Sequence, residues 1–426
     1  MKNLLLLLTL APCIAFGQKT YVPDDIFEDY LETHDSDGWW VFVGDSASMG
    51  DGIANNDSVL TANISTVDTL TLSFGWDIND LTGIEDFIAL TYLRCSSHQL
   101  TSLDVSYNTA LTYLDCGANQ LTSLDVSYNT ALTYLDCGAN QLTSLDVSNN
   151  TALESLWCHA NPLTSLDVSN NTALTDLRCA GNQLTFLDVS NNIALETLVC
   201  HTNQLTSLDV SQNTVLTSVH CYTNQLTSLD VSNNTALTIL YFHENQLTSL
   251  DVSNNTALAD LWCSDNQLTS LDVSNNTDLE LLRCSDNQLT SLDVSNNTAL
   301  TLLDCEYNQL TCLNLKNGNN VNMIALYAVD NPDLTCIEVD DAVWATDNLI
   351  QFNSSNLDPQ TSFSEDCNYP TPCGSGTTGI EELPTIDIEL LYITDILGRT
   401  TLPVPNTLLF YIYEDGSVEK KIQLER

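Results

Sequence analysis

A 21-residue unit repeats through the middle of this chain. It appears as LTYLDCGANQLTSLDVSYNTA from Leu111, returns almost unchanged at Leu132, and continues with substitutions every 21 residues to Ala299. Apolar residues recur within the unit as L-x-x-L-x-C-x-x-N-x-L, and in both halves they alternate with polar residues, which is a strand pattern. Because the period is short and regular, it predicts a chain wound into stacked coils that pack only on their neighbours.

With cysteine in the place of the third leucine, this pattern is that of a leucine-rich repeat. Each unit predicts one coil with two short strands and two asparagine turns. The predicted fold class is therefore an all-β-rich leucine-rich-repeat solenoid of 21-residue coils. One face is a parallel β-sheet and a second side carries short strands, with a short N-terminal helical cap and a small C-terminal β module.

Composition shifts divide the chain into six predicted segments. These are a signal peptide at 1–17, an N-terminal cap at 18–66, the solenoid at 67–340, a C-terminal cap at 341–367, a linker at 368–379 and a β module at 380–426. The first segment joins Lys2 to an apolar run and a small-residue cleavage site at Gly17, as secretory signals do. Lipidation of Cys13 is the alternative. No other stretch has the ~18 apolar residues of a transmembrane segment.

Two short helices are expected in the caps. Asp24 or Asp25 is a good N-cap for the amphipathic stretch that follows, and residues 340–350 resemble a second capping helix. The segment 35–56 between the first helix and the array is rich in Gly, Asp and Ser. We interpret it as a loop, with calcium binding by its aspartates as the alternative.

Ten cysteines share one position of the repeat, and Phe242 takes the place of the missing member. They are Cys95, Cys116, Cys137, Cys158, Cys179, Cys200, Cys221, Cys263, Cys284 and Cys305. A position that accepts Phe requires an apolar filler, so we predict buried thiols. Four cysteines outside this column are the disulfide candidates in an oxidising compartment. We favour Cys336–Cys367, with Cys312–Cys336 as the competitor and Cys373 as the fourth candidate.

Two asparagine columns and one aspartate column also follow the period. One asparagine column runs from Asn119 to Asn308, and we expect each of its members to bond backbone groups of its own coil and the next. The second half-repeat carries its own asparagine column, from Asn108 to Asn297. The aspartates run from Asp104 to Asp293. Like charges stacked ~4.8 Å apart repel unless they are hydrogen-bonded or bridged by cations. Bonds from the flanking serines are the favoured interpretation, and structural calcium as a cofactor is the alternative.

Charge and motifs exclude several functions. The net charge is -46, from 56 acidic and 10 basic residues, which disfavours nucleic acids and anionic membranes as partners. The chain has no G-x-S-x-G, H-E-x-x-H or phosphate-loop motif. Its acids form regular columns that lack the unequal environments separating a general acid from a general base. We therefore predict that the protein is not an enzyme.

Differences between the repeats gather at the outward positions that flank the Leu-x-Cys pair. There the chain concentrates aromatic residues, histidines and arginines, which are typical of binding hot spots. We predict that a protein or glycan ligand binds Trp157, His159, Arg178, His201, His220, Tyr222, Tyr241, His243, Trp262 and Arg283. The alternatives are a tolerant face on a structural spacer and, as a further hypothesis, a metal held by His201, His220 and His243.

The repeat resembles those of secreted bacterial leucine-rich-repeat proteins, and the C-terminal residues resemble the sorting domain of the type IX secretion system. Positions that match the sorting motif are Asp395, Gly398, Arg399, Tyr411, Tyr413, Asp415, Gly416, Val418, Lys420 and Lys421. The resemblance implies export through the inner membrane, then passage of the outer membrane guided by this tail. We thus expect a secreted or cell-surface binding or adhesion protein, with the type IX machinery as a partner.

Overall fold

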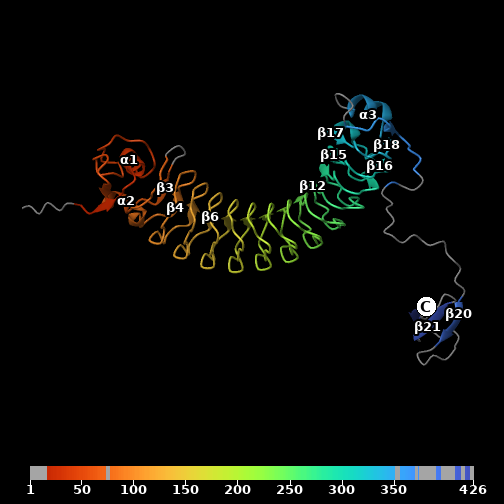
Figure 1. The fold of residues 1–426 in the computed structure, drawn as a ribbon, viewed down its shortest axis with the longest axis horizontal. Coiled ribbons are helices and arrows are strands. Elements are labelled where there is room, and N and C mark those ends of the chain that lie inside the picture. The colour runs from red at the N-terminus through yellow and green to blue at the C-terminus, as the bar shows by residue number, and fades with distance from the viewer. Residues whose placement is uncertain are drawn as a thin grey trace, which may run out of the picture. The chain divides into compact units, whose positions relative to one another are not determined.

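The computed structural model describes residues 17–72, 77–350, 356–369, 373, 390–394, 408–413 and 418–422. The chain divides into two compact units, Met1–Gly374 and Ser375–Arg426. The first unit contains the repeats, wound into stacked coils (Figure 1). The predicted signal peptide up to residue 16 and most of the predicted linker lie outside the described residues.

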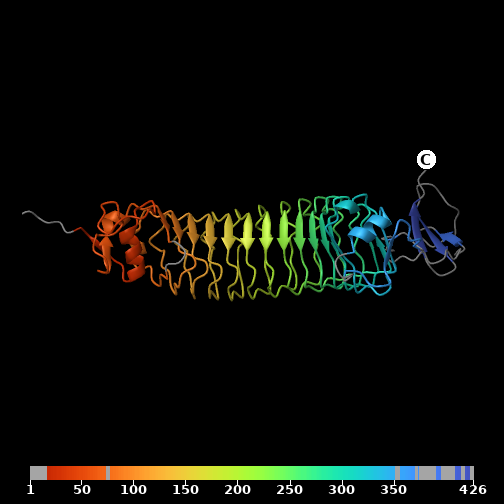
Figure 2. The same ribbon diagram turned by 90° about the horizontal axis from the view of Figure 1, so that it is seen from above.

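A 13-stranded parallel sheet runs along the first unit, with one three-residue strand from each coil. Equivalent residues pair in register, as Leu114 does with Leu135. The strands lie side by side along one face (Figure 2), which is the concave side of the stack in Figure 1. They are β3 (Thr69–Thr71), β4 (Tyr92–Arg94), β5 (Tyr113–Asp115), β6 (Tyr134–Asp136), β7 (Ser155–Trp157), β8 (Asp176–Arg178), β9 (Thr197–Val199), β10 (Ser218–His220), β11 (Ile239–Tyr241), β12 (Asp260–Trp262), β13 (Leu281–Arg283), β15 (Leu302–Asp304) and β17 (Ala325–Tyr327). The predicted leucine-rich-repeat solenoid is confirmed.

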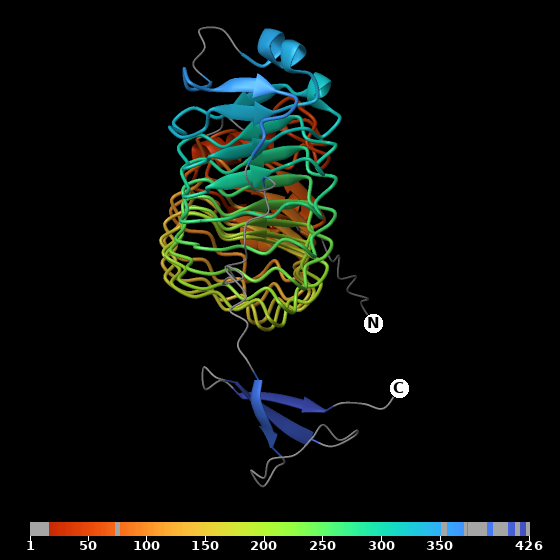
Figure 3. The same ribbon diagram turned by 90° about the vertical axis from the view of Figure 1, so that its right-hand side faces the viewer.

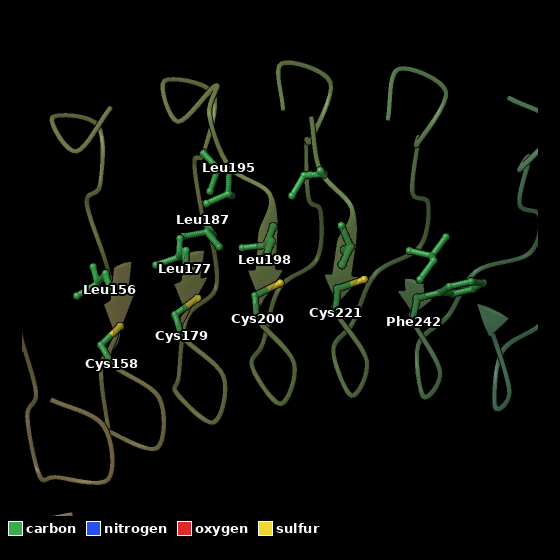
Figure 4. Close-up of a cluster of buried hydrophobic side chains, with 14 of the residues drawn as sticks. Leu156, Cys158, Leu177, Cys179, Leu187, Leu195, Leu198, Cys200, Cys221 and Phe242 are labelled. Atoms are coloured by element: carbon green, nitrogen blue, oxygen red, sulfur yellow. The ribbon is translucent and has the colours of Figure 1, made fainter. Parts of the chain in front are cut away.

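The core is one continuous column of side chains that each coil extends. Strand alternation sends Leu156 and Cys158 inward, and both are fully buried. Figure 4 shows the cysteines of successive coils pointing the same way, with Phe242 continuing their column. All ten ladder cysteines are buried free thiols, as predicted. Burial raises the pKa of Cys179 and Cys221 to about 12, so these thiols stay protonated and act as small apolar groups.

The first asparagine column ties each coil to the one before it. The Asn140 amide donates to the carbonyls of Cys137 and Gly138 in its own coil (3.1 and 3.2 Å) and to that of Cys116 in the preceding coil (3.1 Å). Its Oδ1 accepts the N–H of Leu121, also in the preceding coil (2.9 Å). The prediction that these side chains reach the next coil is wrong. Each strand of the sheet ends just before the cysteine, and the cysteine carbonyl accepts from the asparagine of its own coil and from that of the following coil, as Cys116 does from Asn119 and Asn140.

The second asparagine column bonds only to the preceding coil. Asn171, for example, donates to the carbonyls of Val147 and Asn150 at 3.0 and 2.9 Å. Its Oδ1 is buried without a hydrogen-bond partner among the described residues, as in its equivalents. Because both nearby partners are carbonyls, the amide must present its NH2 group to them, and this fixes its orientation.

The second half of each repeat forms hydrogen-bonded strands only near the C-terminal end. A four-stranded sheet there contains β14 (Ser291–Asp293), β16 (Cys312–Asn314), β18 (Cys336–Glu338) and β19 (Ser362–Ser364). In the earlier described coils this position forms no strand, and Asp104 and Asp125 pair there in an isolated parallel bridge. Consecutive turns follow it, in which Asn108 N donates to Val105 O and Leu111 N donates to Asn108 O. The end-on view in Figure 3 shows these turns closing each coil.

The aspartate column stabilises this turn side. Asp167 Oδ1 accepts the N–H of Ser169 at 2.9 Å, and the same bond recurs along the column. These bonds from serine hold the pKa of Asp167 below its usual value. The serine rows therefore bond the carboxylates as the favoured interpretation expects, and each aspartate closes an Asx turn.

Both ends of the array are covered by helical segments. At the N-terminal end, the Asp24 side chain caps α1 (Asp25–Thr33) by accepting from Ile26 N and Phe27 N. Beside α1 lie α2 (Thr61–Ile64) and the antiparallel pair β1 (Lys19–Tyr21) and β2 (Ser58–Leu60), and the 3-10 turn η1 (Ile84–Asp86) follows in the first coil. At the other end are η2 (Asn320–Asn322) and α3 (Ala342–Asn348). Within the described residues, none of these helices has the length and apolarity needed to cross a membrane.

Two disulfides fasten the C-terminal end of the first unit. The structure joins Cys336 to Cys367, the pair favoured from the sequence, and Cys312 to Cys373. The competing pair Cys312–Cys336 does not form. Those two cysteines stack in successive coils, and each bonds instead to a segment that folds back over the last coils.

The second unit is a small antiparallel sheet in the order β20-β21-β22. Its strands are β20 (Leu390–Thr394), β21 (Leu408–Tyr413) and β22 (Val418–Ile422). The last two strands pair antiparallel, with Tyr411 opposite Glu419, in agreement with the predicted small β module. The predicted motif residues Asp395, Gly398, Arg399, Asp415 and Gly416 lie outside the described residues.

Replacing Asn182 with Ala tests the asparagine ladder. The Asn182 amide donates to Cys158, Cys179 and Ala180, and its Oδ1 accepts from Leu163. Loss of these bonds leaves buried backbone groups unpaired and should lower the free energy of unfolding by about 2–4 kcal/mol, measured by urea denaturation. In the matched control, Asn191→Ala, an exposed asparagine of the same coil loses one bond to Ser169. The control should cost less than about 0.5 kcal/mol; equal losses would contradict the prediction.

Candidate functional site

Three outward columns of side chains cover the concave sheet face. They stand before the core leucine of each strand, between that leucine and the cysteine, and just after the cysteine. All ten predicted binding residues lie on this face, in the second and third columns. They are half-buried except His243, which is buried. We call the aromatic, histidine and arginine side chains of these columns from Tyr92 to Arg283 the aromatic face.

A first stack begins near the N-terminal end of the array. The Tyr92 and Tyr113 rings lie parallel with centroids 4.1 Å apart, and Tyr113 and Tyr134 follow at 4.3 Å. Tyr134 then meets Trp157 edge-on at 5.3 Å. In-register pairing explains this row, because equivalent side chains of neighbouring parallel strands start only ~4.8 Å apart.

Trp157 is held at the end of this stack by the next coil. Its indole Nε1 donates to Asp176 Oδ2 at 3.0 Å. The Arg178 guanidinium lies over the Trp157 ring, 4.4 Å from its centroid, and Arg178 Nε bonds both oxygens of Asp176 at 3.1 Å. The indole is thus fixed by a hydrogen bond and a cation–π contact before any ligand arrives.

A second stack occupies later coils. His201, Tyr222 and His243 lie parallel with ring centroids 4.0 and 4.2 Å apart, and His243 stacks on Trp262 at 4.0 Å. Arg283 lies over Trp262 at 4.8 Å. Each of the two tryptophans therefore has an arginine from the following coil against its ring.

His220 and Tyr241 join the second stack from its side. Their rings are 4.6 Å apart, and Tyr241 meets Trp262 edge-on at 5.7 Å. The Tyr241 hydroxyl donates to Asp260. Burial, and then this bond, raise the pKa of Tyr241 to about 12, so the phenol stays protonated and its ring orientation is fixed.

Three histidines of the aromatic face, His201, His220 and His243, are neutral at pH 7. Burial lowers the pKa of His201 and of His243 to about 4, and the pKa of His220 is also lowered by burial, with Arg178 as the second cause. Neutral imidazoles both donate and accept hydrogen bonds. The positive charge of this part of the face therefore resides on Arg178 and Arg283.

The structure does not bring His201, His220 and His243 together as metal ligands. The Tyr222 ring lies between those of His201 and His243, so the two imidazoles cannot converge. In the part of the chain that the structure describes, one group of three acids has potential ligand atoms within 4.8 Å of one another, namely Asp25, Glu28 and Asp57. The Glu28 carboxylate there already accepts the N–H groups of Asn56 and Asp57 at 2.9 and 3.0 Å.

The column that precedes the core leucine was missed in the sequence-based prediction of the site. It contributes Tyr92, Tyr113 and Tyr134 to the first stack, and Asp176 and Asp260 as anchors. The signal was present, because tyrosine fills this position in three successive coils and two aspartates each precede an aromatic or arginine by two residues.

The lowered pKa values of His201 and His243 predict a pH dependence of stability. In the unfolded chain these histidines titrate near ~6.5, and in the folded protein near 4, so the unfolded state binds more protons between these values. The denaturation midpoint should therefore fall as the pH is lowered from 7 to 4.5. In the variant His201→Gln/His243→Gln the fall should be smaller. An identical pH profile in the parent and the variant would contradict the assignment.

Comparisons with known proteins support the fold. No family model and no curated protein matches the chain. Among solved structures, it is similar to the functional domain of InlJ from Listeria monocytogenes, which includes a cysteine ladder. That match has 28% identity and a TM-score of 0.58 over 96% of this chain and 99% of that one.

Two further structures share the architecture. An internalin, inlF, from Listeria monocytogenes matches with a TM-score of 0.66 and 22% identity over 82% of this chain and 97% of its own. The leucine-rich-repeat protein LIC12759 of Leptospira interrogans matches with a TM-score of 0.52 and 23% identity over 66% and 74%. The chain thus has the leucine-rich-repeat solenoid fold, and its structural neighbours include bacterial proteins of the internalin type.

Proposed function

We propose that this protein is a secreted or cell-surface binding protein, and that its aromatic face binds a protein or glycan ligand. The observation that carries the proposal is the pair of tryptophans, Trp157 and Trp262, each fixed by neighbouring rings and by an arginine of the next coil. Rigid aromatic anchors lose little conformational entropy on binding.

The repeat itself supports a specialised concave face. The second half-repeats keep the sequence LTSLDVS in most coils, whereas the sheet columns change from coil to coil. Both halves share the same duplicated origin, so a neutral history would scatter substitutions over both. Protein ligands would use the Trp, Tyr and Arg side chains as hot spots. A glycan would stack on the rings and bond the neutral imidazoles.

A second candidate is a structural spacer that binds no specific ligand. The near-constant second half-repeats favour it, because they show that much of the surface serves only the stacking of coils. The spacer function predicts that no part of the aromatic face is needed for any interaction of the mature protein.

Replacing Trp157, Tyr241 and Trp262 together with Ala separates these functions. A protein and glycan array probed with the native chain identifies the ligand. The triple variant should then bind that ligand at least about a hundredfold more weakly, because each anchor is expected to contribute ~1–2 kcal/mol. The control variant replaces Trp39, Trp40 and Phe42, three exposed aromatic residues of the N-terminal cap. Unchanged binding by the triple variant would refute the role of this face.

We also propose that the C-terminal unit is a type IX sorting signal. The support is the resemblance of residues 392–424 to that family and the antiparallel hairpin formed by β21 and β22. Tyr411, Tyr413, Val418, Lys420 and Lys421 of the motif lie in these two strands. The C-terminal unit would then direct the protein across the outer membrane.

Deleting residues 380–426 tests whether the C-terminal unit is needed for secretion. In a bacterium with type IX secretion, the truncated chain should accumulate in the periplasm, whereas the full chain should reach the surface or the medium. Fractionation and immunoblotting measure the distribution. Normal delivery of the truncated chain would contradict the proposal, and it would leave the binding role of the aromatic face untouched.

A further inference from the structure

A groove of about 710 Å³ lies on the second-half side of the array, near its N-terminal end. It forms where the first regular coil packs on an irregular one. Asn108 donates to the carbonyl of Ile84 in the 3-10 turn η1 and to that of Phe87 just after it, whereas its equivalents meet a copy of their own turn. Leu103 lines the groove and is half-buried.

The groove has an apolar floor and acidic walls. Leu81, Ile84 and Leu103 line its bottom. Its walls carry the carboxylates of Asp80, Glu85, Asp104 and Asp125, and among the described residues that line it none is Lys or Arg. The volume falls in the range of ~300–1,000 Å³ that is usual for ligand sites.

Two tyrosines stand at the rim. Tyr107 and Tyr128 line the groove and are 67% and 60% exposed. In every later regular coil the same position is Asn or Gln, as at Asn149, Asn170 and Gln212. Asn149 and its asparagine equivalents each donate to a serine carbonyl of the preceding coil, a bond that Tyr107 and Tyr128 do not make in this structure. In the two coils that border the groove, tyrosine therefore replaces the Asn or Gln that later regular coils have at this position.

We propose that this groove binds a peptide segment that carries Arg or Lys side chains. The acidic walls complement a cationic head group, the exposed tyrosine rings offer cation–π contacts, and the apolar floor accommodates the aliphatic stem of a long basic side chain. The net charge of -46 draws such a ligand toward the surface, and the groove supplies the local selectivity. This site is separate from the aromatic face, because its residues belong to the other half of the repeat.

The test measures binding of a fluorescein-labelled peptide in which three arginines alternate with glycine, by fluorescence anisotropy of the mature chain at about 0.15 M salt. The variant Tyr107→Asn/Tyr128→Asn introduces the residue that other coils already contain, so its fold is kept. Its affinity should fall about tenfold. The control Phe186→Ser removes another exposed aromatic, restores the serine of the other coils, and should leave affinity unchanged.

A second pair of variants separates local recognition from net charge. Asp104→Asn/Asp125→Asn keeps the Asx turns, because Asn Oδ1 still accepts the serine N–H. It should weaken the peptide about tenfold, whereas Asp230→Asn/Asp251→Asn, at the same repeat position outside the groove, should weaken it less than about twofold. Equal effects of both pairs, equal binding of a peptide with Gln in place of Arg, or displacement of the peptide by a neutral hexasaccharide would each overturn the proposal.

Discussion

The amide of the buried asparagine is the interaction on which the rest of this structure depends. In each coil it satisfies carbonyl groups left open where the sheet ladder ends, and it does so in its own coil and the preceding one. Because every coil makes the same bonds, successive strands pair in register. That register places identical core leucines and cysteines above one another, and it also aligns the outward columns.

The aromatic face is a product of this alignment. Neighbouring rings start close enough to stack, so a tyrosine or histidine repeated in one column forms a rigid row without dedicated support. The rows end at Trp157 and Trp262, where an arginine from the next coil lies against the ring. Burial keeps His201, His220 and His243 neutral, so the surface combines uncharged hydrogen-bonding groups, apolar rings and a few fixed cations.

The sequence predicts the parts of this fold that follow from periodicity. The 21-residue period and the alternation within it identify the coils, the buried leucines and the cysteine column. Periodicity does not reveal which backbone group an asparagine meets, because that depends on where the ladder ends. Periodicity also predicts a second strand in every coil, whereas the structure has such strands only near the C-terminal end. The aspartate and asparagine side chains of that half-repeat bond the backbone and favour turns over a strand ladder.

The site was predicted only in part for a similar reason. Alternation identifies the face on which Trp157 lies, but its contacts with Tyr134 and Asp176 cross from one column to another. Such diagonal pairs depend on side-chain rotamers, which a residue pattern does not encode. The groove beside Leu103 could not be predicted from the repeat pattern, because it forms where the first regular coil packs on an irregular coil.

The direction of the asparagine bonds has a consequence for how such a chain is assembled. The asparagine of each coil bonds backbone groups of the coil before it. Asn161, for example, donates to the Cys137 carbonyl and accepts the N–H of Leu142. When a polypeptide emerges N-terminus first, during synthesis or translocation, the backbone groups that each new asparagine bonds therefore belong to a coil that has already emerged. Folding of a repeat array can start at any coil, but in this direction of emergence the coil that accepts the new asparagine bonds is always already present.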